Sequence, residues 1–537
     1  MKKQFKTLLA LALVLALCCG LMAACAKTQE PAATPTSDTQ PQQTEPVNSD
    51  QPDSPKEEEP EQTPEPEAEP EPEEPTEIVV TFLDLRRTAA DYGDHVAEAI
   101  RAHCLEAANL DVEMHWVQIP DWQNNVMLGI TSGERMDVIA AFAANSISSL
   151  YSRGLVRDIK TELETYASDA LEMMKDYMNV ATYDGGIYGM PAYRNYAKNS
   201  YIIMNAEVLD NLGLREKAEN MTTFHEFEEI LAAVKEAETD QGTGMYAFGS
   251  KSGLWSNEKL THGDKFADID VYDVLGDTTS SVHCADGKVE NLFAMQDFAD
   301  ECARVADWRA QGYIWPDSSI TDETQDGLMK QKVLFSVAMG SELGVEVTKA
   351  ASYGYEVVCR QIAPGMIKTS QPLAWGCAVP INSEEPEAAA KFINLLYTDA
   401  DLMNLLVWGV EGTDYTLEDG QVVQNPDGRF ETTDFLVGNN LLLTPLKGNG
   451  TDFYQRVQAT NESAPKSPYL GFAINTADMD MVLGQINAVN DQYRTDLISG
   501  NYTPELYDEY VTKLEAAGVQ DYLDQIQAQL DAWLAAK

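Results

Sequence analysis

The chain has 537 residues, of which 87 are Asp or Glu and 37 are Lys or Arg, so its formal charge at neutral pH is −50. A negative charge of this size repels nucleic acid and anionic membrane surfaces, and no nucleic-acid partner is expected. Hydrophobic residues make up 44% of the chain, enough to bury large cores in two or three domains. Beyond residue 24 no apolar run approaches the roughly 18 to 20 residues that cross a bilayer. The composition therefore predicts a folded protein whose membrane contact would come only from its N-terminal segment.

Residues 1–24 have the pattern of a secretory signal peptide. Lysines at positions 2, 3 and 6 precede an apolar stretch from Leu8 to Leu17 that is too short to be a stable membrane span. The next residues, Leu-Met-Ala-Ala-Cys at 21–25, resemble the lipobox of bacterial lipoproteins. This resemblance implies a lipid on Cys25 and a protein anchored at the extracellular face of the cell membrane. Cleavage after Ala24 without lipidation is the alternative.

Residues 25–77, after the lipidated cysteine, are predicted to form a disordered tether. The segment consists mainly of Pro, Glu, Gln, Thr and Ser, and it holds roughly half of the chain's 24 prolines. Such a composition cannot form a core, and repulsion between its acids favours an extended, partly polyproline-II chain. At about 3 Å per residue, some 50 residues reach beyond about 100 Å.

From residue 78 the sequence alternates short β-rich runs with amphipathic helices. Strands are predicted at 78–83, 112–117 and 137–142, with helices through Val96 to Leu105, from Trp122 to Ser132, and from Leu150 toward Gly154. This alternation is typical of a mostly parallel sheet covered on both faces, whose ligands bind beyond the carboxyl ends of the strands. The loops that follow the three strands hold Asp84, Arg86, Tyr92, Trp122 and Asn145. Farther along, Thr222 or Thr223 with Glu226 predicts a capping box at the start of a helix.

Five segments resemble the family 1 extracellular solute-binding proteins of ABC importers, and in particular the large lipoproteins of carbohydrate importers. In chain order they are residues 132–139, 184–191, 201–209, 386–397 and 409–415, and residues 471–472 and 516–533 resemble the C-terminal extension of that subgroup. In the fifth segment, Thr413-Asp414 stands where the family pattern has Lys-His before Tyr415.

The resemblance implies an α/β, two-lobed periplasmic-binding-protein-like fold of type II, with discontinuous lobes joined by a hinge. We expect lobe one at 78–200 and 360–410, and lobe two at 201–359 and 411–537 with a C-terminal helical extension. The implied function is capture of an oligosaccharide between the lobes and its delivery to the permease subunits of an ABC transporter. We expect a monomer.

Catalytic and cofactor motifs are weak in this sequence. The six histidines are scattered without a His-Glu-x-x-His pattern, and two Ser-x-x-Lys matches, at Ser256 and Ser463, lack the companion motifs of a serine acylase. Neither an enzymatic activity nor a cofactor or metal is therefore expected. Cys284 with Cys302, or Cys359 with Cys377, could form a disulfide in an extracellular protein, and buried free thiols are an equal alternative.

Sugar binding needs an aromatic platform for the C–H face of the ring and polar side chains for its hydroxyl groups. The residues selected as ligand-binding are Arg86, Trp122, Asn145, Tyr193, Arg194, Asn195, Trp255 and Trp375. For each aromatic residue alone core packing is the alternative, and for Arg194 it is a hinge salt bridge. A peptide or amino-acid binder anchored by Arg86, Arg87 or Arg194, and a glycan-binding surface adhesin without a transporter, are the alternative functions.

Overall fold

The computed structural model describes most of the chain beyond the predicted tether. The described residues are 74–84, 93–241, 259–261, 263–276, 282–314, 325–330, 335–341, 343–425, 430, 436–476 and 479–537. Residues Pro72–Lys537 form one compact unit. Cys25, Arg86 and Trp255 lie outside the described residues. None of the helices in the described ranges is both long and apolar enough to cross a membrane.

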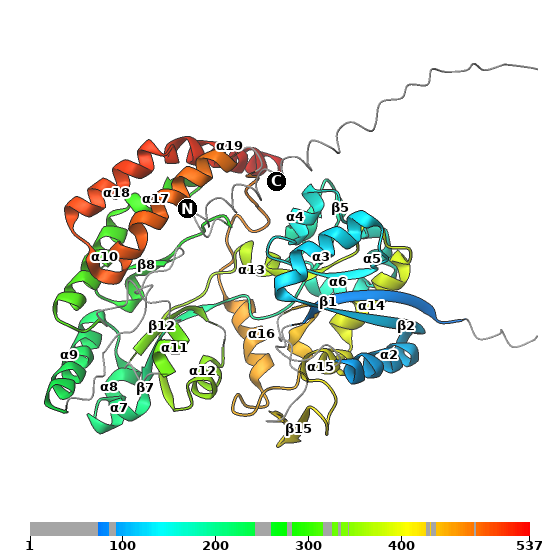
Figure 1. Cartoon of the computed structure of the whole chain (residues 1–537), viewed down its shortest axis with the longest axis horizontal. Helices are drawn as coiled ribbons and strands as arrows, with labels where there is room; N and C mark the ends of the chain where they lie inside the picture. The colour runs from blue at the N-terminus through cyan, green and yellow to red at the C-terminus, as the bar shows by residue number, and fades with distance from the viewer. Residues whose placement is uncertain are drawn as a thin grey trace, which may run out of the picture. The chain divides into compact units, whose positions relative to one another are not determined.

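A five-stranded sheet forms the centre of the first lobe (Figure 1). Its order is β2 (Leu110–Gln118), β1 (Thr76–Asp84), β3 (Val138–Phe142), β14 (Trp375–Ala378) and β6 (Met190–Pro191). The strands β2, β1 and β3 are parallel, whereas β14 runs antiparallel to β3 and β6. Because β14 is antiparallel, its first residue, Trp375, pairs with Phe142, the last residue of β3. Trp375 is thereby placed at the carboxyl edge of the parallel strands.

The helices of the first lobe bury one apolar face each. α2 (Asp94–Ala108) buries Val96, Ile100 and Cys104, which recur every four residues and so share one face. This helix ends at Asn109, which adopts the left-handed conformation of a C-cap. The lobe also contains α3 (Ile119–Ser132), α4 (Ile147–Ser152), α5 (Lys160–Tyr166), α6 (Ser168–Met174), α14 (Pro386–Thr398) and α15 (Ala400–Trp408). The predicted βαβ pattern from residue 78 to residue 154 is confirmed, with boundaries displaced by a few residues.

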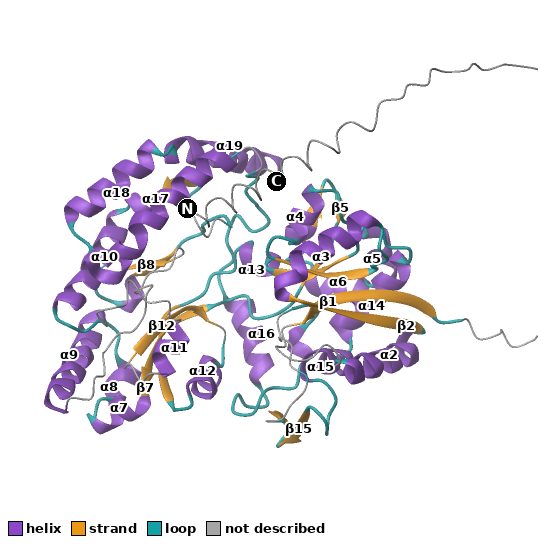
Figure 2. Cartoon of the chain, in the orientation of Figure 1, coloured by secondary structure: helices purple, strands orange, loops and turns teal. Residues whose placement is uncertain are grey.

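The second lobe is built on an antiparallel sheet of three strands (Figure 2). Their order is β12 (Phe335–Ser341), β7 (Asn199–Asn205) and β13 (Val357–Ala363). The surrounding helices are α7 (Ala206–Asn211), α8 (Arg215–Asn220), α9 (Phe224–Gln241), α10 (Gln296–Ala310), α11 (Gln325–Lys330) and α12 (Val345–Tyr353). Two short hairpins, β8 (Lys259–Thr261) with β9 (Ile269–Val271) and β10 (Val282–Ala285) with β11 (Lys288–Asn291), complete it. The capping box is present, since the backbone N–H of Glu226 donates to Thr223 Oγ1 at 3.1 Å and that of Thr223 donates to the Glu226 carboxylate at 3.1 Å.

The C-terminal segment packs as a helical group against α10. It comprises α17 (Asp480–Asp496), the short η5 (Leu497–Asn501), α18 (Pro504–Ala516) and α19 (Val519–Ala536). Phe298 and Cys302 of α10 share one hydrophobic core with Tyr510 of α18 and Ile526 of α19. The extension is therefore joined to the second lobe through an apolar core rather than through surface contacts alone.

The lobe boundary predicted at residue 410 needs correction. Tyr415, Val422, Phe453 and Val457 belong to the same hydrophobic core as Phe82 of β1. The hairpin β15 (Tyr415–Glu418) with β16 (Gln421–Gln424) and the helix α16 (Phe453–Ser463) thus bury their apolar side chains in the first lobe. We therefore place the stretch from Tyr415 to Val457, which was expected in lobe two, in the first lobe.

Three chain segments connect the lobes, and they lie against one another. The first runs through residues 192–198, and the second and third meet at Ile367, whose N–H donates to the Pro465 carbonyl at 2.9 Å. A Cβ atom at Gly365 would lie 2.5 Å from the backbone nitrogen of Lys198, so only glycine permits this approach. The side chain of Asn461 accepts from the Tyr196 N–H at 2.8 Å and donates to the Arg194 carbonyl at 2.7 Å. Buried amide hydrogen bonds therefore tie the first crossing to α16.

Candidate functional site

Three aromatic rings form an array at the carboxyl end of β3. The ring of Phe142 stacks on Trp375, with ring centroids 4.6 Å apart and an interplanar angle of 16°. It also contacts Trp122, with ring centroids 5.3 Å apart. Trp122 and Phe142 are buried, whereas Trp375 is half-buried. The Trp375 carbonyl accepts the N–H of Ala192 at 2.9 Å, which joins this edge of the sheet to the first hinge crossing.

A pocket of about 600 Å³, which we call the cleft pocket, is lined by residues next to this array in sequence, although none of the three rings is among its lining residues. It borders the array directly in sequence, because Ala143 follows Phe142 and Ala374 precedes Trp375. Three groups of residues line it: Ala143, Ser146 and Ser148 after β3; Thr369, Ser370, Leu373 and Ala374 at the short helix α13 (Ser370–Leu373); and Leu275, Gly276, Phe472, Ala473, Ile474, Thr476, Leu483 and Tyr522 from the second lobe and its extension. The cleft pocket is therefore built from both lobes and the hinge.

The cleft pocket combines hydroxyl groups with apolar walls. None of its described lining residues is charged, although the chain carries a formal charge of −50. Its hydroxyl groups come from Ser, Thr and Tyr side chains, each of which can both donate and accept a hydrogen bond. Such a lining suits a neutral ligand rich in hydroxyl groups, because no buried charge awaits a counter-ion.

Asn145 belongs to the loop after β3 that borders the cleft pocket, and Trp122 contacts Phe142 at the end of that strand. Asn145 is fully buried, and its amide donates to the Gln123 carbonyl at 3.4 Å. Within the described part of the chain, the Asn145 amide oxygen and the Trp122 indole N–H have no hydrogen-bond partner. A buried donor or acceptor left in this way costs free energy unless water or a ligand satisfies it. The Asn145 amide oxygen is thus an acceptor, and the Trp122 indole N–H a donor, that a water or ligand near this loop could satisfy.

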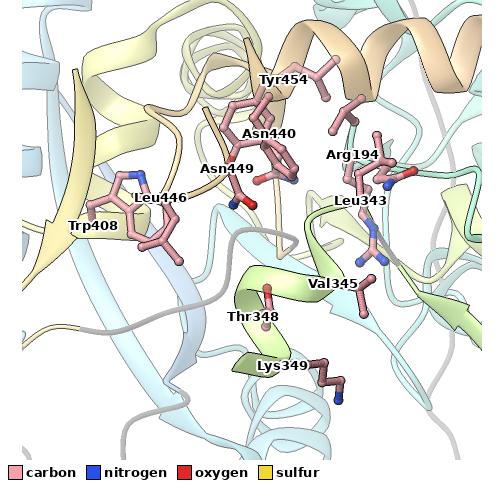
Figure 3. A pocket seen from close by; sticks show the side chains of 14 residues that line it. Arg194, Leu343, Val345, Thr348, Lys349, Trp408, Asn440, Leu446, Asn449 and Tyr454 are labelled. Carbon is pink, nitrogen blue, oxygen red and sulfur yellow. The ribbon is translucent and has the colours of Figure 1, made fainter. Parts of the chain in front are cut away.

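The remaining predicted residues lie at the first hinge crossing. Tyr193 is half-buried and packs against Tyr177 and Tyr196, and burial raises the pKa of its hydroxyl. Arg194 and Asn195 are buried and line a different pocket, shown in Figure 3. The sequence prediction grouped these residues with Trp375, but the structure separates the lining residues into two pockets. Arg86 and Trp255 lie outside the described residues and are not placed by it.

The residues that the second lobe brings to the cleft pocket are not among the predicted ligand-binding residues. Phe472 and Tyr522 follow Ser146 by more than 300 residues, and no local pattern around them points to a ligand. Thr369 and Ser370 precede Trp375 within a short polar stretch. Their nearness in sequence to a predicted ligand-binding tryptophan is the feature that could have identified them as lining residues. The similarity of residues 471–472 to the family extension marked the segment but not its role.

At the departure Thr413-Asp414, Thr413 is exposed and Asp414 is buried, and neither residue lines either pocket. The Asp414 carboxylate accepts from the Val410 N–H at 2.7 Å and from His95 Nε2 at 2.8 Å. A Cβ atom at Gly409 would meet the same carboxylate, so glycine allows the loop to close over it. Asp414 therefore holds the 409–415 loop to α2.

The weak catalytic matches have structural roles where they are described. The Ser463 hydroxyl donates to the Ala459 carbonyl at 2.7 Å within α16, and Lys466 forms an ion pair with Asp176 at 2.7 Å. Ser256 lies outside the described residues. Within the described ranges no group of three or more His, Cys, Asp or Glu side chains could hold a metal ion.

The five cysteines of the folded region are free thiols. Cys104, Cys284, Cys302 and Cys377 are buried, and Cys359 is half-buried. Of the two alternatives left by the sequence, the structure thus has thiols rather than disulfides at these positions. Burial raises the pKa of each, so each stays protonated near neutral pH.

Two α/β lobes with a pocket built from both of them define a protein that captures a ligand between its lobes. Residues 101–409 match the family of bacterial extracellular solute-binding proteins, and the chain belongs to that family. The predicted family is thereby confirmed. Residues 468–535, which contain the C-terminal helical group, match a second family described as Domain of unknown function (DUF3502).

The chain is similar to characterised proteins over most of its length. It is 26% identical over 457 residues to a carbohydrate ABC transporter substrate-binding protein of Streptococcus pneumoniae serotype 4, covering 80% of this chain and 85% of that protein. Among solved structures it resembles the N-glycan transport solute binding protein NgtS of Streptococcus pneumoniae, with a TM-score of 0.71 and 19% identity over 86% of this chain and 99% of that one. An extracellular solute-binding protein of Bifidobacterium longum subsp. infantis gives a TM-score of 0.55 and 16% identity, over 85% and 98% of the two chains. These similarities confirm the predicted two-lobed fold.

Proposed function

We propose that this protein captures an oligosaccharide in the cleft pocket and delivers it to the permease subunits of an ABC importer. The observation that carries the proposal is the lining of the cleft pocket, whose described residues are uncharged and rich in hydroxyl groups and adjoin Phe142 and Trp375 in sequence. A neutral sugar presents hydroxyl groups to such a lining and apolar C–H faces to aromatic rings. The role is ligand binding without catalysis.

The relatives support this ligand class. The related protein of Streptococcus pneumoniae is described as a carbohydrate ABC transporter substrate-binding protein, and NgtS has been solved in complex with Man5GlcNAc at a TM-score of 0.61 to this chain. A peptide or amino acid carries charged termini, and the described lining of the cleft pocket offers them no charged partner. A neutral oligosaccharide therefore fits the pocket better.

The direct test is binding of glycans by the purified Cys25→Ser protein. A glycan array identifies candidate oligosaccharides, and isothermal titration then compares this protein with a variant whose cleft pocket is filled. Ala473 is exposed and lines the cleft pocket, so Ala473→Trp blocks it without disturbing a core. Ala516→Trp is the matched control, because Ala516 is an exposed alanine of the same C-terminal segment that lines neither pocket.

We expect Ala473→Trp to abolish oligosaccharide binding and Ala516→Trp to leave it unchanged. Affinity should change little between low and physiological salt, because the ligand and the described lining are uncharged. A ligand that binds equally well to both tryptophan variants would place the site elsewhere. Steep weakening by salt would point to a charged ligand such as a peptide.

We further propose that the protein is anchored by a lipid on Cys25 at the extracellular face of the membrane. The family is extracellular, and residues 21–25 have the lipobox pattern. Cys25→Ser removes the acylated sulfur and should move the protein from the membrane fraction into the culture medium. Retention of the Cys25→Ser protein in washed membranes would contradict the anchor.

A further inference from the structure

A second pocket, of about 290 Å³, lies at the first hinge crossing, and we call it the hinge pocket (Figure 3). It is lined by Arg194 and Asn195 of the crossing, by residues 343–349 of the second lobe, and by residues 408 and 440–457 of the first lobe. None of its lining residues lines the cleft pocket. A ligand held there would contact both lobes and the crossing between them.

Two asparagines, Asn440 and Asn449, contribute amide groups to the hinge pocket, whose other polar lining residues are Arg194, Asn195, Thr348, Lys349 and Tyr454. Asn440 is 3% exposed, and in the described part of the chain neither its amide nitrogen nor its amide oxygen has a hydrogen-bond partner. The same holds for the amide oxygen of Asn449. The backbone N–H of Asn440 is bonded to the Tyr193 carbonyl at 2.8 Å, so its main chain is fixed while its side chain lines the pocket. A buried amide costs free energy unless a partner in the pocket satisfies it.

Aromatic and aliphatic side chains form the apolar part of the hinge-pocket lining. Trp408, Phe453 and Tyr454 are each less than one-tenth exposed, and Leu446 and Val457 lie among them. No acidic residue lines the pocket in the described ranges. The charge of Lys349 is matched by Asp326, with the ammonium and carboxylate 2.8 Å apart. Its volume is near the lower end of the roughly 300 to 1,000 Å³ found for small-molecule sites, which is room for a single ring rather than for a chain of sugars.

We propose that the hinge pocket is a second binding site, specific for one small, polyhydroxylated molecule such as a monosaccharide. The amides of Asn440 and Asn449 bond its hydroxyl groups, and the aromatic and aliphatic walls cover its C–H surface. Because the lining comes from the first crossing and from both lobes, an occupant stabilises one arrangement of the two lobes. Occupancy is then coupled to binding in the cleft pocket, and the coupling is reciprocal.

The test uses the Cys25→Ser protein and four probes at millimolar concentration: mannose, glucose, galactose and N-acetylglucosamine. Binding is measured by isothermal titration and by ligand-observed NMR. Asn440→Leu removes the buried amide and fills the pocket with an apolar side chain of similar size, a change that a folded protein tolerates because no existing side-chain hydrogen bond is lost. Asn394→Leu is the matched control, because Asn394 also has a buried, unpartnered amide oxygen but lines neither pocket.

We expect at least one monosaccharide to bind the parent and Asn394→Leu proteins, and Asn440→Leu to weaken it at least tenfold. Ala473→Trp, which blocks the cleft pocket, should leave this binding intact, so a failure of the proposed cleft function does not affect the result. Absence of binding by all four probes would overturn the proposal. Binding that is lost in Ala473→Trp but kept in Asn440→Leu would also overturn it, because the monosaccharide would then occupy the cleft pocket.

Discussion

Replacing Glu301 by glutamine is predicted to change how the stability of the protein depends on pH. Glu301 lies on α10 and is only 5% exposed. Desolvation raises the pKa of its carboxyl from 4.5 to about 7, although the positive charge of Arg304 and a hydrogen bond with Thr261 act in the opposite direction. The folded state therefore binds a proton at Glu301 more tightly than the unfolded state does.

The size of the effect follows from these two pKa values. Their difference corresponds to about 3 kcal/mol, since one pKa unit is worth about 1.4 kcal/mol. Below pH 4.5 the carboxyl is protonated in both states and imposes no cost. As the pH rises through 7 the folded protein must accept a buried carboxylate, and the cost grows from about 1 kcal/mol at pH 5 to about 3 kcal/mol at pH 8.

Glutamine keeps the shape and hydrogen-bonding capacity of the protonated acid but cannot ionise. We expect the free energy of unfolding of Glu301→Gln to exceed that of the parent by about 2 kcal/mol more at pH 8 than at pH 5. The assay is urea unfolding of both proteins at the two pH values. Asp307→Asn, an exposed acid on the same helix, is the control. A difference between Glu301→Gln and the parent that stays constant with pH would refute the reasoning.

The remaining predictions concern the first lobe, the site and the thiols. Asp137 is fully buried and accepts hydrogen bonds from the Val79 N–H and the Ser383 hydroxyl, so Asp137→Ala should lower the free energy of unfolding by about 3 kcal/mol, whereas the exposed Asp169→Ala should not. Trp375→Ala should weaken oligosaccharide binding about 5- to 150-fold through loss of the aromatic stack, and an unchanged titration would remove Trp375 from the site. A thiol reagent should leave the four buried cysteines, Cys104, Cys284, Cys302 and Cys377, unmodified until urea unfolds the protein, and rapid labelling of these thiols in the native protein would contradict their burial.

Much of the first lobe could be predicted from local sequence. The four-residue spacing of Val96 and Ile100 identifies the buried face of α2, and the fully buried β3 is a continuous apolar run. The Thr223–Glu226 capping box was likewise visible because its partners are three residues apart. Patterns of this kind report which face of an element is buried.

They do not report what buries it. The apolar face of α16 looks the same whether Val457 packs in the first lobe or the second, and only the fold shows that Val457 shares a core with Phe82. In the same way, Arg194 lines the hinge pocket and Ala374, beside Trp375, lines the cleft pocket, but only the three-dimensional path of the hinge decides that the pockets differ. Contacts between segments more than 100 residues apart are set by packing of the whole chain, which local periodicity does not contain.

The central claim is that the two lobes close on an oligosaccharide held in the cleft pocket. Small-angle X-ray scattering of the Cys25→Ser protein tests it, with and without a saturating oligosaccharide taken from the glycan array and with Ala473→Trp measured in parallel. The account predicts that the ligand lowers the radius of gyration of the parent, because binding favours the closed population, and leaves Ala473→Trp unchanged. A scattering profile of the parent that does not change at saturation would contradict it.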